Sequence, residues 1–79
     1  MQKRSMTIHG HRTSISLEEP FWMALNDIAK ARQQSVASLV QMIDQKRVGG
    51  LSSAIRVFIL AELRHQLAAS TTAKTNEIF

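Results

Sequence analysis

The sequence predicts a small, mainly α-helical fold in which one strand precedes three helices. Residues 12–17, RTSISL, alternate polar and apolar side chains, which is typical of a strand with one buried face. Three later segments carry apolar residues at helical spacing. With 79 residues and no cysteine, the chain is expected to form one domain without disulfides. A chain this short often needs a metal or a second subunit for stability.

The strand is expected to begin near His11 and to have two chemically different faces. Its core-facing side chains are Thr13, Ile15 and Leu17, and its opposite face carries Arg12, Ser14 and Ser16. The apolar side suits a core, and the polar side suits water or a ligand.

A lone strand leaves backbone groups unpaired, so it needs a partner. It could be irregular coil despite its pattern, or form a hairpin that turns at His9-Gly10, or pair with the same strand of a second copy. The third arrangement is favoured, because an antiparallel pair across a two-fold axis also supplies the additional core that a small chain needs. The sequence therefore predicts a homodimer.

Helix boundaries follow from local signals. The first helix begins at Glu18-Glu19-Pro20, since acids and proline are favoured in a first turn, and should end near Arg32-Gln33. Ser35 is the expected N-cap of the second helix, which Gly49-Gly50 ends. Ser52 is the expected N-cap of the third.

Apolar stripes on the strand and the first two helices predict the core of the dimer. Its expected members are Ile15, Leu17, Phe21, Trp22, Leu25, Ile28, Leu39, Val40 and Ile43. The third helix is apolar on more than one face, so it is expected to be buried on two sides.

Charge is concentrated at the N-terminal end. The net charge is +4, and residues 1–17 contain three Lys/Arg and two His but no acid. Such a basic end suggests a polyanionic partner, most often nucleic acid, although it could also be a solubilising terminus. Residues 1–10 are predicted to be a basic arm, residues 11–67 the folded domain, and residues 68–79 a disordered tail.

Several functional classes find no support in the residues. No secretory signal or membrane span is recognisable, and the most apolar run contains Arg56, so a cytoplasmic protein is expected. No catalytic motif is present, so the chain is not expected to be an enzyme and needs no cofactor. His9, His11 and His65 could bind a metal, but structural or phosphate-contacting roles are favoured, since no thiol or carboxylate lies near the first two.

The segment RTSISL, a helix with Phe21, Leu25 and Ile28, the link RQQS and the helix start SVASLVQMI together resemble the ribbon-helix-helix (MetJ/Arc-type) superfamily. The resemblance covers roughly residues 11–46. The additional C-terminal helix is similar to that of a bacterial branch of this superfamily. The resemblance to the superfamily implies an intertwined homodimer whose two strands form an antiparallel ribbon in the major groove of DNA.

The resemblance also implies site residues. The base-contacting side chains would be Arg12, Ser14 and Ser16. Phosphate contacts would come from Ser35, Val36 and Ala37 at the start of the second helix, and from Lys3, Arg4 and His11. The function implied is a bacterial, sequence-specific transcriptional repressor that binds an inverted repeat.

Two other functions remain open at this point. The chain could be a protein-interaction or antitoxin-like module that binds a partner through its third helix, and exposed Val57, Leu60 and Leu63 would favour this alternative. It could also bind nucleic acid without sequence preference, which a specificity ratio near one would indicate.

Overall fold

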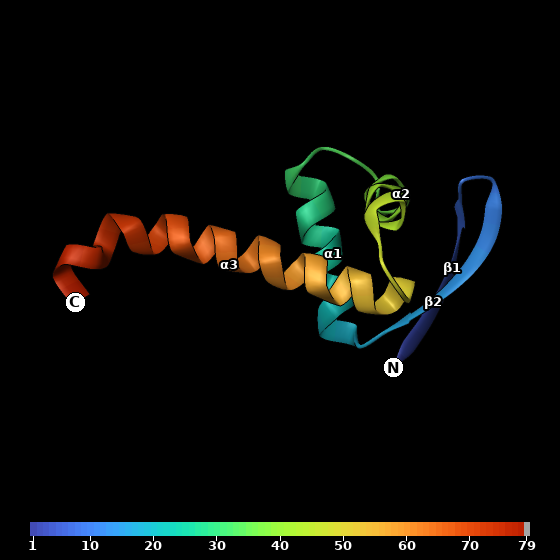
Figure 1. Ribbon diagram of the computed structural model, residues 1–79, viewed down its shortest axis with the longest axis horizontal. Helices are drawn as coiled ribbons and strands as arrows, with labels where there is room; N and C mark the ends of the chain where they lie inside the picture. Colours follow the sequence, from blue (N-terminus) through green and yellow to red (C-terminus); the bar gives the residue numbers. More distant parts are fainter. Residues whose placement is uncertain (79) are drawn as a thin grey trace.

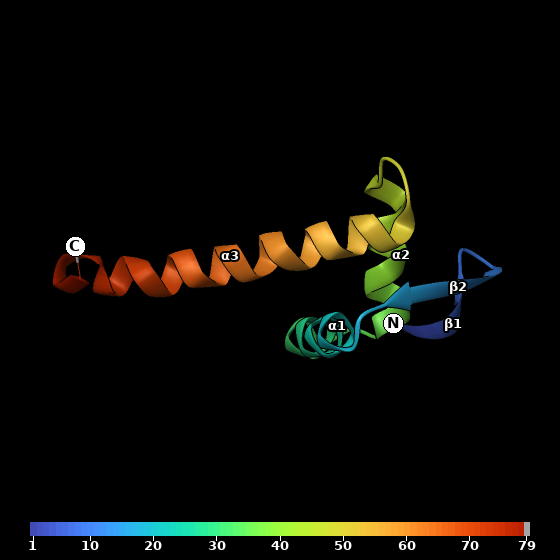
Figure 2. The ribbon, with the colours of Figure 1, turned by 90° about the horizontal axis from the view of Figure 1, so that it is seen from below.

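The computed structural model describes the backbone of residues 1–78 and the side chains of residues 1–69. Two strands are followed by three helices (Figures 1 and 2). The elements are β1 (Gln2–Ile8), β2 (His11–Leu17), α1 (Glu19–Ala31), α2 (Val36–Lys46) and α3 (Leu51–Ile78). The predicted class, a mainly helical chain with a strand ahead of three helices, is confirmed.

The partner of β2 is β1 of the same chain. The two strands pair antiparallel from Gln2↔Leu17 to Ile8↔His11. Within the chain the hairpin alternative is the one adopted, so the expectation of a lone strand is corrected, whereas pairing of β2 with a second copy stays a prediction. A two-residue turn, His9-Gly10, has positive φ at both positions, 51° and 79°, as a hairpin turn that matches strand twist requires.

Contacts with α2 hold this turn in place. The backbone N–H of His9 donates to Gln41 Oε1 at 3.1 Å, and the His9 ring nitrogen Nε2 lies 3.5 Å from a carboxylate oxygen of Asp44. A left-handed conformation is uncommon for a residue with a side chain, so these contacts offset an unfavourable backbone position at His9.

Both ends of the chain are more ordered than the sequence predicts. The segment expected to be a basic arm forms β1, because each backbone group of a hairpin strand finds its partner on the neighbouring strand. Helix α3 continues through residues 68–78, where a disordered tail was expected. No glycine or proline follows Gly50, so nothing in the sequence interrupts helix propagation.

A single chain encloses its own core. Eight of the nine predicted core side chains are buried, and the ninth, Phe21, is half-buried against them. Ile8, Ala29, Ile55 and Ile59 are also buried. The predicted core residues are thus covered without a second copy, and their assignment to a dimer core stays a prediction.

The helix boundaries follow local hydrogen bonds. Ser35 caps α2, since its hydroxyl accepts from the Ser38 N–H at 3.0 Å. Helix α3 begins earlier than its expected cap at Ser52, because the Gly50 carbonyl already accepts from the Ala54 N–H at 3.0 Å.

Helix α3 extends well past the rest of the molecule. Its first turns lie across α1 and α2, and its later turns project away from them (Figures 1 and 2). Its buried residues in the described part, Ile55 and Ile59, lie on one side only. Within residues 1–69 of this single chain, no other element covers its second apolar side, so the expected burial on two sides is not reached within one chain.

Candidate nucleic-acid interface

The hairpin has a polar face that points away from the helices. Directly paired residues of an antiparallel sheet lie on the same face, so the register groups the pairs Lys3↔Ser16, Ser5↔Ser14 and Thr7↔Arg12. Five of these six side chains are exposed and Ser16 is half-buried. These six residues are called the outer face below: Lys3, Ser5, Thr7, Arg12, Ser14 and Ser16.

The structure places Arg12, Ser14 and Ser16 together, on the face that the sequence predicts. It also adds Ser5 and Thr7, which sequence reasoning missed. Their alternation with Met6 and Ile8 was the available signal, but the basic residues before them obscured the strand pattern. The hydroxyl groups of Ser5 and Ser14 lie 3.3 Å apart, so they share a hydrogen bond across the strands.

The opposite, inner face packs on the helices and carries two residues predicted to contact phosphate. Arg4 pairs with buried Ile15, and its guanidinium carbon lies 4.8 Å from the centroid of the Trp22 ring. Arg4 also lies 3.8 Å from a carboxylate oxygen of Glu19. His11 is an inner-face residue as well, exposed beside the turn. Arg4 and His11 therefore do not share the face of Arg12.

Most arginines of the described residues are already engaged with carboxylates. The ion pairs are Arg4–Glu19, Arg32–Glu62, Arg47–Asp44 and Arg56–Glu18. Among residues 1–69, Lys3 and Arg12 form no ion pair and no side-chain hydrogen bond. The outer face contains no acid, so its two cations are free to bind an anion.

The ion pair between Arg56 and Glu18 changes the pKa of the Glu18 carboxyl. The Arg56 guanidinium donates to Glu18 through Nε at 2.9 Å and through Nη2 at 3.2 Å. This hydrogen bonding lowers the pKa of the Glu18 carboxyl from its ordinary value, and the backbone N–H of Glu18 lowers it further. Arg56 therefore forms a structural contact that joins α3 to the end of β2.

The predicted phosphate contacts on α2 lie in its first turn. The hydroxyl of Ser35 is exposed and caps the helix, while Val36 and Ala37 are half-buried. The first N–H groups of a helix lack carbonyl partners within it, so the start of α2 carries partial positive charge.

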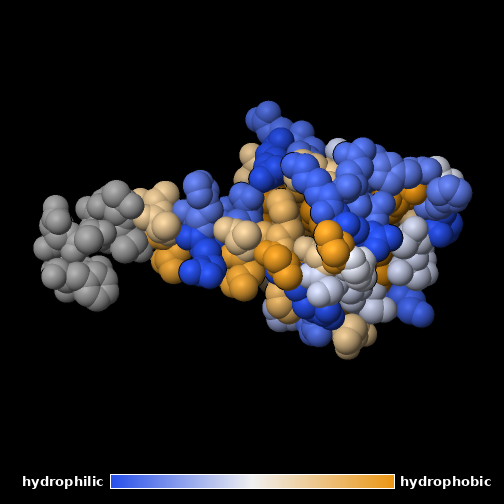
Figure 3. All heavy atoms as spheres, viewed as in Figure 1, coloured by the Kyte–Doolittle hydropathy of each residue, from blue (hydrophilic) through white to orange (hydrophobic). Residues whose placement is uncertain are grey.

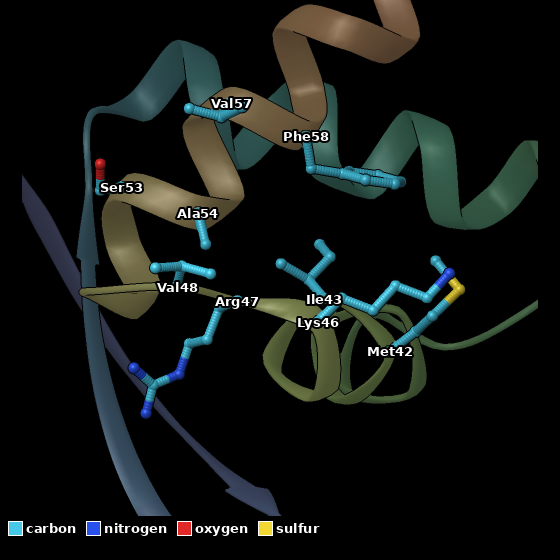
Figure 4. Close-up of a pocket in the computed structure, with 9 residues that line it drawn as sticks. All are labelled: Met42, Ile43, Lys46, Arg47, Val48, Ser53, Ala54, Val57 and Phe58. Carbon is cyan, nitrogen blue, oxygen red and sulfur yellow. The ribbon is translucent and has the colours of Figure 1, made fainter.

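Exposed apolar side chains follow α3 where it leaves the body of the molecule (Figure 3). Val57, Leu60, Leu63 and Leu67 are 64%, 57%, 45% and 66% exposed. Val57 stands between two grooves. One, of about 340 Å³, lies between α2 and α3 and includes Met42 and Phe58 (Figure 4), and the other, of about 230 Å³, lies between α1 and α3.

Two further findings concern metals and membranes. Within the described residues, no group of three or more His, Asp or Glu side chains comes together in a way that could hold a metal ion. His9 instead lies beside Asp44. No helix in the described part of the chain combines the length and apolarity needed to cross a membrane.

The architecture defines a class of small domain that displays a two-stranded ribbon on a helical support. The family model for the ribbon-helix-helix domain matches residues 1–63. The chain therefore belongs to the ribbon-helix-helix family. As a family, these domains are DNA-binding and regulatory rather than enzymatic, and they generally bind DNA as dimers. Searches of curated proteins and of solved structures found no match.

Proposed function

We propose that this chain is a sequence-specific transcriptional regulator, acting as a repressor, that inserts the outer face of its hairpin into the major groove of duplex DNA. One observation carries the proposal. Arg12 stands unpaired on an exposed, acid-free strand face beside Ser14 and Ser16, whereas four other arginines are held by carboxylates.

The chemistry of this face suits base edges. The major groove accommodates a two-stranded ribbon, and a guanidinium donates two parallel hydrogen bonds to O6 and N7 of guanine. The hydroxyls of Ser14 and Ser16 both donate and accept, so they tolerate several base edges. The N–H groups of Val36 and Ala37, with the Ser35 cap, would bind a backbone phosphate.

The expected target is an inverted repeat, because the family generally binds DNA as dimers and a two-fold dimer places its two contacts symmetrically. Such a regulator would work in the bacterial cytoplasm. The phosphate contacts should make the affinity fall steeply with salt concentration.

The test is a selection of duplexes from a random-sequence pool, followed by affinity measurements on a selected and an unselected duplex. Arg12→Ala should weaken binding of the selected duplex by about 1–3 kcal/mol, which is about 5- to 150-fold, with little effect on the unselected one. Arg64→Ala is the matched control, since Arg64 is an exposed arginine of α3. Equal losses in the two variants, or no selection of any sequence, would contradict sequence-specific recognition by this face.

A second candidate function is supported by the exposed apolar surface of α3. This surface fits an amphipathic helix of a protein partner with acidic flanks. The only charged side chain exposed on the described part of α3 is Arg64, and Glu62 is engaged by Arg32. A photo-crosslinker placed at Leu63 tests this candidate in cells. An acidic, helical partner peptide would support it, whereas cross-linking to a second copy of this chain would count against it.

A further inference from the structure

The groove between α2 and α3, called the α2–α3 groove below, has the size and lining of a small-molecule site. We infer that it binds a small aromatic carboxylate, with the ring between Met42 and Phe58 and the carboxylate at Lys46. None of the residues that line this groove belongs to the outer face or to the first turn of α2. The inference therefore does not rest on the proposed DNA-binding function.

The α2–α3 groove is concave and lined mainly by apolar side chains. Its volume of about 340 Å³ lies at the lower end of the range of ligand pockets, about 300–1,000 Å³. Ile43 of α2 and Ala54 and Phe58 of α3 lie on opposite sides of it (Figure 4). A stable contact between two protein chains covers about 800 Å² on each partner, so a space of this size suits one small molecule better.

Arg32 holds in position both side chains that would contact the ring. Its guanidinium carbon lies 5.3 Å from the centroid of the Phe58 ring, and its Nη1 lies 3.9 Å from the Met42 sulfur. Arg32 Nη2 in turn donates to Glu62 Oε2 at 2.8 Å, which fixes the guanidinium. Met42 and Phe58 are thus placed before a ligand arrives, so little side-chain freedom is lost on binding.

The same two side chains favour an aromatic ligand over an aliphatic one. Aromatic rings attract each other in offset or edge-to-face arrangements beyond the effect of burial, and a methionine sulfur is attracted to a ring edge. Phe58 and Met42 are both half-buried, so each keeps open surface on the groove.

The charged side chains that line the α2–α3 groove are both cations, and only one of them is available. Arg47 points away from the groove (Figure 4) and donates to Asp44 and to the Gly49 carbonyl. Lys46 is exposed and, among residues 1–69, forms no ion pair and no side-chain hydrogen bond. An anionic group therefore meets a free ammonium and no acid in the lining, which distinguishes a carboxylate from a neutral ligand.

Two exposed valines at the edge of the groove add apolar surface that a ligand can cover. Val48 is 98% exposed and Val57 is 64% exposed, and both line the groove. Val48 lies in the link between the two helices, beside Ala54 (Figure 4), and the bond from Arg47 to the Gly49 carbonyl holds that link. Contact of a ring with either valine removes apolar surface from water and so favours binding.

The site is tested by titrating the full chain with naphthoate and, separately, with naphthamide, a neutral analogue that has the same ring system. Amide signals in heteronuclear NMR spectra report where each probe binds. Naphthoate should shift the signals of residues 42–48 and 53–58 in a saturable way. No saturable shift, or equal affinity for naphthoate and naphthamide, would overturn the inference.

The role of the ammonium is tested by comparing Lys46→Gln with Lys30→Gln, an identical change at an exposed position of α1. Lys46→Gln should weaken naphthoate binding by about 2- to 5-fold, as expected for an ion pair open to solvent, and leave naphthamide binding unchanged. Lys30→Gln should change neither. Equal losses for both probes in Lys46→Gln would overturn the assignment of the carboxylate to Lys46.

The place of the ring is tested by filling the groove. Ala54→Phe puts a larger side chain into it and should abolish the shifts, whereas Ala61→Phe, at an exposed position of the same helix, should leave them unchanged. Circular dichroism checks that both variants fold, and sedimentation measures their molar mass. If Ala54→Phe lowers the molar mass of the protein in solution, the groove is covered by a second copy, and the inference is wrong.

Discussion

Lys3 and Arg4 are neighbouring cations on one strand, and the two faces of the hairpin give them opposite circumstances. Lys3 is exposed on the outer face with no ionic partner among the described residues. Arg4 lies over the Trp22 ring and beside Glu19. A step of one residue along a strand reverses the face. Positive charge alone therefore does not identify a DNA contact; the face and the existing partners of the cation decide its role.

The same contrast separates the two faces as a whole. The inner face uses apolar and paired groups to hold the hairpin on the helices, and its largest side-chain partner is Trp22, which is fully buried. The outer face keeps hydroxyls and unpaired cations in water. Mutations on the inner face should therefore change stability, and mutations on the outer face should change DNA binding.

The largest effect is expected for Trp22→Ala. It should lower the free energy of unfolding by about 3–5 kcal/mol, because it leaves a cavity and removes the hydrogen bond to Gln2. Urea denaturation followed by circular dichroism measures this loss. Met23→Ala, at a side chain that is 61% exposed, should change stability by less than about 0.5 kcal/mol. Similar losses in the two variants would show that the hairpin does not depend on this core contact.

At the start of α2, the capping and phosphate roles of Ser35 can be separated. Ser35→Ala should destabilise the chain by about 1 kcal/mol, since the bond to Ser38 N–H is lost. Ser35→Asp should keep the stability, because aspartate caps equally well, yet weaken DNA binding at low salt through repulsion of phosphate. Thermal melts and duplex titrations measure the two effects. Unchanged DNA affinity in Ser35→Asp would remove α2 from the interface.

Arg4→Ala should lower the stability, as expected for an inner-face residue, but by less than Trp22→Ala or Ser35→Ala. A loss of about 0.5–1 kcal/mol is expected, mainly from the contact with the Trp22 ring, since an exposed ion pair adds little. The salt slope of DNA binding should not change. A reduced slope, measured beside that of Lys3→Ala on the same duplex, would mean that Arg4 also meets a phosphate.

The smallest effect is a pH dependence at Glu18. Arg56 lowers the pKa of Glu18 in the folded chain, so the resulting stability is present above the unfolded pKa and is lost as the pH falls through the folded pKa. Glu18→Gln should therefore narrow the difference in Tm between neutral and acidic pH. Melts of both proteins across this range measure it. A pH dependence identical to that of the wild type would show that this ion pair contributes nothing to stability.

The sequence predicts which face of β2 each side chain occupies, but it does not predict which strand pairs with β2. The alternation from Arg12 to Leu17 predicts which side chains face outward, since side-chain direction is local. Strand pairing is not local, and Lys3 to Ser5 gave β1 no apolar signal. The register alone places Arg4 and His11 on the inner face. It also places Ser5 and Thr7 on the outer face.

For α3, the composition predicts apolar sides but not what covers them. Ile55 and Ile59 find partners in the core, whereas Val57 and Leu60 remain exposed. These four residues are all aliphatic and lie on the same helix. Only the arrangement of α1 and α2 distinguishes the covered side from the uncovered one, and a hydropathy pattern contains no information about it.

A hairpin that closes within one chain makes the pairing of its two strands a first-order event. In an intertwined dimer, subunit concentration enters the folding equilibrium, and dilution unfolds the protein. Here the turn at His9-Gly10 joins the two strands covalently, so each strand meets its partner at a local concentration that dilution does not change. Pairing of β1 with β2 should therefore be independent of protein concentration, unlike any contact between two copies of the chain.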